Sequence, residues 1–153
     1  MGEYLSSPAF LKKTLVNYAE GGSTSASYSP LNLKADFLSN LDAQMHSYVP
    51  SSKDLAIFFL GANDYIVLHK DNIINVIEQQ IDDIEKMLNN GVDNILVMGI
   101  PDLSLTPQSR ETDNNRQLKD ISFAHNSLLQ HNIAELQGKY PTKKICYFDT
   151  SGA

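Results

Sequence analysis

The residues best suited to chemistry are Asn63 and Asp64, in the tetrapeptide Gly61-Ala62-Asn63-Asp64. They follow an apolar run from Leu55 to Leu60, whose aromatic and β-branched composition predicts a buried strand. In open α/β sheets, sites lie beyond the carboxyl ends of the strands, and Gly61 lets the backbone turn sharply there. An asparagine amide at that point can donate a hydrogen bond to a developing oxyanion, which favours ester chemistry.

A second donor is available at Gly21-Gly22, which ends a short strand predicted from Thr14 to Ala19. A glycine offers its backbone N–H without a side chain to hinder approach, so Gly22 or Gly21 can share an oxyanion hole with Asn63. We expect Asp64 to hold its own loop by accepting backbone N–H bonds. Asn and Asp are also common turn residues after strands, so the tetrapeptide alone is compatible with a purely structural turn.

Five segments of the chain match short sequence motifs: Val16–Ser23, Phe59–Tyr65, Gly99–Pro107, His125-Asn126 and Tyr140-Pro141. In their order they resemble the GDSL, or SGNH, lipase and esterase family, over roughly residues 14–149. The segment Gly99–Pro107 resembles one common in the plant enzymes and in bacterial lysophospholipase, haemolysin and acyltransferase members, and the bacterial lipolytic members match best. The resemblance implies that Gly22 and Asn63 are the two oxyanion donors, with Gly61 and Asp64 in support.

The chain departs from this family where the nucleophile and base belong. The family's serine lies in a Gly-Asp-Ser block on the first strand, and its Asp and His lie three residues apart near the C-terminus; the sequence contains neither motif. It also lacks a Gly-x-Ser-x-Gly elbow. The resemblance therefore implies that residues 1–153 are a single domain, the central part of an SGNH hydrolase domain, and that this fragment is inactive by itself.

In the full-length protein, the resemblance implies a serine attack on a carboxylic ester, with histidine relaying protons. Lipid acyl esters such as lysophospholipids are the expected substrates, and carbohydrate acetyl esters the second choice. Whether this chain is itself an enzyme stays open. It could be a non-catalytic α/β module that binds a ligand or partner at the same rim, or an active enzyme of unusual architecture using Ser6, Ser7 or Ser23.

The elements that would position these residues alternate between strand and helix. An amphipathic helix is predicted from Pro30, with Leu33, Phe37, Leu38, Leu41 and Met45 on one face. Later elements are a helix over Asn72–Asn90 capped by Gly91, a strand over Asn94–Gly99, a helix ending near Gln137 and a strand over Ile145–Phe148. The order predicts an α/β fold: a three-layer α/β/α, flavodoxin-like SGNH hydrolase with a mainly parallel sheet, here incomplete.

An incomplete sheet has a physical consequence. In the flavodoxin-like strand order, the first strand lies between two others, so its absence leaves unpaired strand edges. We expect such a fragment to be less stable than a complete domain or to self-associate through those edges.

Composition excludes several other classes of function. The formal net charge of -6 and scattered Lys and Arg residues argue against nucleic acid as a partner. The sequence has no apolar run long enough for a transmembrane segment. The residues from Met1 onward have no basic or apolar region typical of a signal peptide, although family members are often secreted, so the localisation is left open.

No cofactor or metal is expected. His125 and His131 lie six residues apart on one predicted helix, which does not match the i,i+4 spacing of helical metal ligands, and both are interpreted as structural. His69 could line the site or be a solvated loop residue. The single cysteine, Cys146, is interpreted as a small hydrophobic residue of the last strand.

Overall fold

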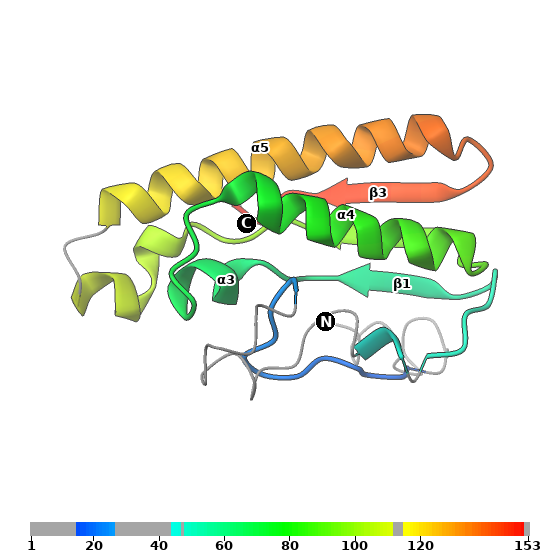
Figure 1. Ribbon diagram of the computed structural model, residues 1–153, viewed down its shortest axis with the longest axis horizontal. Helices are drawn as coiled ribbons and strands as arrows, with labels where there is room; N and C mark the ends of the chain where they lie inside the picture. The colour runs from blue at the N-terminus through cyan, green and yellow to red at the C-terminus, as the bar shows by residue number, and fades with distance from the viewer. Residues whose placement is uncertain (1–14, 27–43, 47, 112–114, 152–153) are drawn as a thin grey trace, which may run out of the picture.

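The computed structural model describes residues 15–26, 44–46, 48–111 and 115–151 (Figure 1). Its elements are, in chain order, β1 (Leu55–Phe58), α3 (Ala62–Ile66), α4 (Ile73–Asn89), β2 (Asn94–Met98), the 3-10 helices η1 (Leu103–Leu105) and η2 (Pro107–Glu111), α5 (Asn115–Lys139) and β3 (Lys144–Phe148). The later strands and helices that the sequence predicts are therefore confirmed, with ends shifted by one or two residues.

The three strands form one parallel sheet in the order β1-β2-β3. Phe58 of β1 lies beside Val97 of β2, and Val97 lies beside Tyr147 of β3. Each strand pairs with the next one along the chain, and right-handed crossovers place both connecting helices on the same face. The α/β class with a parallel sheet is thus confirmed, and the described residues provide the sheet and one of its two expected helical layers.

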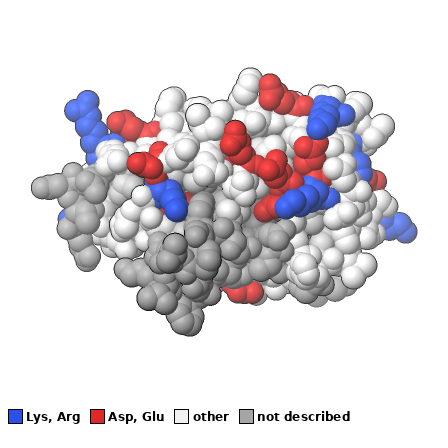
Figure 2. Space-filling model, viewed as in Figure 1, with Lys and Arg blue, Asp and Glu red and all other residues white. Residues whose placement is uncertain are grey.

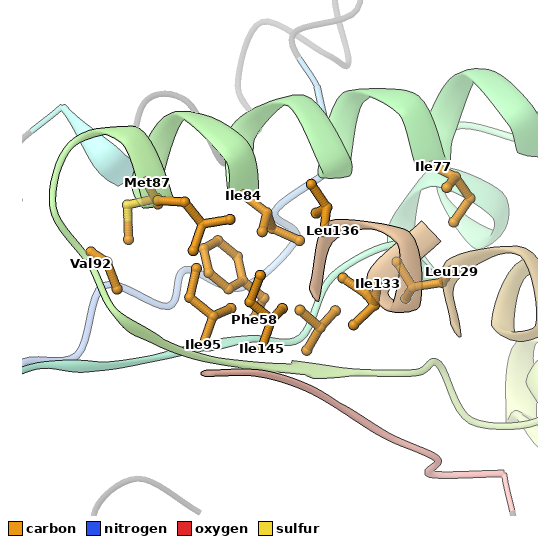
Figure 3. Packing of buried hydrophobic residues seen from close by; sticks show 12 residues of the cluster. Phe58, Ile77, Ile84, Met87, Val92, Ile95, Leu129, Ile133, Leu136 and Ile145 are labelled. Carbon is orange, nitrogen blue, oxygen red and sulfur yellow. The ribbon is translucent and has the colours of Figure 1, made fainter. Parts of the chain in front are cut away.

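The core lies between this face of the sheet and helices α4 and α5 (Figure 3). The two helices supply residues at spacings of three and four, and the strands supply alternate residues, as their periods require. Its buried members include Ile77, Ile84 and Met87 of α4, Leu129, Ile133 and Leu136 of α5, and Phe58, Ile95 and Ile145 of the strands. The polar residue Asn72 caps the start of α4 through its side chain, and Gly91, at φ +105°, follows its end.

The opposite face of the sheet is apolar and open to solvent among the described residues. Leu55 is 55% exposed, Ile57 37% and Phe148 46%, and Cys146 is also exposed. The second helical layer therefore stays a prediction, and the buried position expected for Cys146 is wrong because that residue points to the open face.

Two predictions near the N-terminus differ from the structure. The strand expected over 14–19 is not formed by its described part, residues 15–19, where Val16 is 62% exposed. The predicted helix from Pro30 lies outside the described residues, except that Gln44 and Met45 are helical and Met45 packs against the core.

Candidate active site

The candidate site begins at the turn between β1 and α3. Gly61 adopts φ +111°, a conformation that residues with a side chain rarely adopt. A Cβ atom on Gly61 would also lie 2.7 Å from Cε1 of His125 and 3.0 Å from Nε2 of Gln80. Both the backbone turn and the close approach of α4 and α5 therefore require glycine here. The sequence missed α3 itself, because five residues are too few to show a helical period.

The turn brings Asn63 against the segment that contains Gly22. Nδ2 of Asn63 donates a hydrogen bond of 2.9 Å to the carbonyl oxygen of Ser23, 40 residues earlier in the chain. Gly22 directly precedes Ser23 and adopts φ +86°. Both Asn63 and Gly22 are partly accessible to solvent. The two residues predicted from separate motifs are thus held next to one another.

Asp64 binds the same segment two residues further on. Its carboxylate accepts the backbone N–H of Ser25 at 3.1 and 3.2 Å and the Ser25 hydroxyl at 3.2 Å. Nε2 of Gln80, on α4, donates to the same hydroxyl at 2.8 Å. All three side chains are buried. The role of Asp64 therefore extends beyond its own loop, which is where the sequence placed it, to a segment 39 residues away.

Residues 21–26, which carry Gly22, Ser23 and Ser25, are called the strap from here on. The sequence suggested that the end of a strand would position Gly22. Instead, hydrogen bonds to Asn63 and Asp64 hold the strap against α3.

Tyr65 of α3 and His125 of α5 form a buried pair. The Tyr65 hydroxyl and Nδ1 of His125 are 2.8 Å apart, and the rings meet edge to face at a centroid distance of 5.5 Å. Burial lowers the pKa of His125 to about 4, so the imidazole is neutral at pH 7. Burial likewise raises the pKa of Tyr65, with a smaller contribution from the charge of Asp64. The pair fixes α3 to α5, which agrees with a structural role for His125.

The other two histidines of the sequence analysis lie at the surface. His131 makes an exposed contact of 3.4 Å with Glu135, one turn along α5. His69 is exposed and adopts φ +52°, in the loop after α3. Among the described residues, no side-chain hydrogen bond joins His69 or His131 to the strap or to α3, so neither histidine belongs to the site.

The serines of the strap have structural hydrogen bonds. The Ser23 hydroxyl donates to the carbonyl of Glu20 at 2.6 Å and accepts from Nε2 of Gln44 at 2.7 Å. Ser23 is 4% exposed and Ser25 is fully buried, so a substrate cannot reach either hydroxyl. Ser23 is therefore a poor nucleophile, and Ser6 and Ser7 lie outside the described residues.

The loops after β2 and β3 lie at the same edge of the sheet as Asn63, because parallel strands end together. Asn126 of α5 holds the first of these loops, accepting the N–H of Ile100 and donating to its carbonyl, both at 2.8 Å. Asp102 accepts the backbone N–H and hydroxyl of Ser104 and so caps η1. Asp149 is similarly bonded to Ser151, and these bonds lower its pKa.

Sequence reasoning missed two buried polar residues next to Asn63 and Asp64, namely Ser25 and Gln80. A signal exists for Gln80, which lies on the apolar face of α4 between Ile77 and Ile84 and has a long polar side chain where an apolar one is expected. Ser25 has no such signal, because its loop shows no periodicity.

Surface charges complete the description of the site's surroundings. Figure 2 shows acidic and basic side chains intermixed on one face. Ion pairs among the described residues include Lys86–Asp83 at 2.7 Å and Lys143–Asp93 at 2.6 Å. Among residues 15–26, 44–46, 48–111 and 115–151, no three His, Cys, Asp or Glu side chains are grouped so that they could bind a metal ion. Each helix in this part of the chain is too short or too polar to cross a bilayer.

Comparison with known proteins gives one family and two relatives. The family model for GDSL-like lipases and acylhydrolases matches residues 2–153. The chain is 64% identical over 151 residues to the secreted effector protein SseJ of Salmonella typhimurium strain LT2, and 27% identical over 165 residues to a phosphatidylcholine-sterol acyltransferase of Aeromonas hydrophila. The matches cover 99% and 97% of this chain but 37% and 48% of the relatives. The chain therefore spans less than half the length of the curated relatives that it matches.

Proposed function

Because this chain belongs to the GDSL-like lipase/acylhydrolase family, we propose that it is the central part of a hydrolase domain that cleaves or transfers acyl esters. Gly22 and Asn63 are its two oxyanion donors. The observation that carries this proposal is the hydrogen bond from Asn63 to Ser23, which holds the two predicted donor positions together across 40 residues of sequence.

The chemistry follows from the amide of Asn63. A carboxamide has two N–H donors, and the bond to Ser23 uses one of them and fixes the plane of the group. The other N–H can meet the oxygen of a tetrahedral intermediate, together with the backbone N–H of Gly22. Donors held in place before the reaction stabilise the developing charge without reorganising. In this proposal the serine nucleophile and the Asp-His pair come from residues outside positions 1–153 of this chain.

The proposed substrates are lipid acyl esters. One relative is named as a phosphatidylcholine-sterol acyltransferase, which names a phospholipid as acyl donor and a sterol as acceptor. We propose the same donor class here, with water or a sterol hydroxyl as the acceptor. The other relative is named as a secreted effector, and we propose that the protein containing this chain is also exported. Immunoblotting of culture supernatant for the tagged protein tests the export, and its retention in the cells would contradict it.

The activity is tested on the full-length gene product with phosphatidylcholine vesicles, with and without cholesterol. Replacing Asn63 by Ala is expected to lower kcat by about 10²–10³-fold, as loss of one oxyanion donor does elsewhere. Asn132→Ala is the matched control, because Asn132 lies on α5 and its side chain only donates to the carbonyl of Leu128. Unchanged turnover in Asn63→Ala would refute the proposed role.

The 153-residue chain by itself is expected to be inactive. A fluorophosphonate probe, which labels activated serines, is therefore expected to leave it unlabelled. Labelling would refute the fragment interpretation and identify an unusual nucleophile. A non-catalytic binding module would instead show no turnover in the full-length protein.

We also propose that the chain by itself associates through its sheet. Among the described residues, β1 and β3 are the outer strands, and the uncovered face carries Leu55, Ile57 and Phe148. Outer strands expose backbone groups that pair readily with another chain. Size-exclusion chromatography combined with a thermal melt tests this, and a monomer with a sharp two-state melt would contradict it.

A further inference from the structure

The buried hydrogen bond between Ser25 of the strap and Gln80 of α4 is not used in the proposed reaction. Gln80 is 3% exposed, and Ser25 and Asp64 are fully buried. None of the three can touch a substrate. Yet these polar groups come from three different parts of the chain: the strap, α3 and α4.

Their hydrogen bonds run in one direction. Gln80 Nε2 donates to the Ser25 hydroxyl at 2.8 Å, and that hydroxyl donates to Oδ2 of Asp64 at 3.2 Å. The backbone N–H of Ser25 donates to the same carboxylate. The bonds that Asp64 accepts from Ser25 are charge-assisted and stronger than neutral ones, whereas the bond from Gln80 to Ser25 joins two neutral groups. The Ser25 hydroxyl is both acceptor and donor, so its position is fixed from two sides.

This series lies next to the oxyanion donors on both sides. Asp64 directly follows Asn63 in α3, and Ser25 lies two residues after Ser23, whose carbonyl receives the Asn63 amide. Loss of the bonds at Ser25 would weaken the attachment of the strap to α3, while the bond between Asn63 and Ser23 would stay in place. Gln80 adds a third anchor, which joins the strap to α4, a helix that packs in the core through Ile77 and Ile84.

We infer that Ser25 and Gln80 are positioning residues, which together with Asp64 hold the strap so that Gly22 and Asn63 stay in register. Their effect on the reaction passes through the orientation of the Asn63 amide. This inference rests on the proposed function for its catalytic meaning, but the orientation of Asn63 can be measured without any turnover.

The test uses ¹⁵N-labelled 153-residue chain and the side-chain NH₂ signals of Asn63, assigned by their absence in Asn63→Asp. In Ser25→Ala, these signals are expected to move toward the values of a free amide and to exchange with solvent about tenfold faster. Ser25→Thr keeps the hydroxyl and is expected to restore them. Ser127→Ala, an exposed serine on α5, is the control and is expected to leave them unchanged.

A folded Ser25→Ala chain with unchanged Asn63 signals would overturn the inference. If that variant does not fold, Gln80→Met decides, since it keeps the length of the side chain and the Ser25–Asp64 bonds. It is expected to shift the Asn63 signals in the same direction by a smaller amount, and their constancy would overturn the inference.

In the full-length protein, Ser25→Ala is expected to lower kcat by about 10²-fold with little change in KM, as small displacements of catalytic groups do. If Asn63→Ala leaves turnover intact, the proposed function fails, while the NMR result still reports on the positioning. If Asn63→Ala abolishes turnover and Ser25→Ala does not affect it, the positioning inference fails alone.

Discussion

Lowering the pH from 7 to 5 is expected to destabilise this fold through His125. The side chain is fully buried between α5 and α3, with Nδ1 2.8 Å from the Tyr65 hydroxyl. Burial lowers its pKa to about 4 in the folded chain. In the unfolded chain, where the ring is hydrated, a pKa of about 6.5 applies.

The sign of the effect follows from proton binding. Between pH 6.5 and 4, the unfolded state binds a proton at His125 and the folded state does not, so stability falls as the pH falls. Each pKa unit corresponds to about 1.4 kcal/mol. The two pKa values therefore predict a loss of about 2 kcal/mol between pH 7 and pH 5, rising to about 3 kcal/mol below pH 4.

Urea unfolding at pH 7 and pH 5 measures this loss. His125→Gln removes the titrating group. Between pH 7 and pH 5, the free energy of unfolding of this variant is therefore expected to fall less than that of the original chain, by a difference of about 2 kcal/mol. His131→Gln is the matched control, because His131 is an exposed histidine on the same helix. An equal pH dependence in the original chain and His125→Gln, or an NMR titration midpoint of His125 near 6.5, would refute the reasoning.

Four substitutions test other contacts by urea unfolding. Gly61→Ala is expected to destabilise the chain by about 3 kcal/mol, because φ is +111° and the new Cβ would lie 2.7 Å from His125. The control Gly138→Ala has open space around it and is expected to stabilise α5 by about 0.5 kcal/mol. Equal effects of the two substitutions would contradict this prediction. Asn126→Ala leaves both backbone groups of Ile100 buried without their partner, at about 3 kcal/mol. Lys143→Met removes the donor to the carbonyls of Leu88 in α4 and Val92 after it, and the ion pair with Asp93, and is expected to cost about 2 kcal/mol. A loss below about 0.5 kcal/mol would show that water replaces the ammonium group.

The sequence was sufficient for the sheet and its two long helices because their signals are local. The apolar run that begins at Leu55 and the helix that Asn72 and Gly91 delimit are visible within a few residues of chain. Glycine and asparagine caps also mark element ends through backbone conformation alone. The expected strand over 14–19 failed because short apolar stretches form strands only where a neighbour pairs with them.

The site was predictable in part. Motif order indicated Gly22 and Asn63, and the structure brings their segments together. The bonds from Ser25 and Gln80 to this place were not predictable, since they join side chains 39 to 55 residues apart. Such contacts depend on how the elements pack, and neither spacing nor hydrophobic period records them.

The sequential order of β1, β2 and β3 has a consequence for how the site is assembled. Each strand pairs with the next one to be synthesised, so the sheet closes through the connections that contain α4 and α5 and needs no pairing between strands further apart in the chain. The strap leaves the ribosome before that sheet exists and can dock only after α3 and α4 have been made. The proposed oxyanion donors Gly22 and Asn63 therefore meet only after α3 and α4 have been made, and a strap that docks slowly would delay assembly of the proposed site without delaying formation of the sheet.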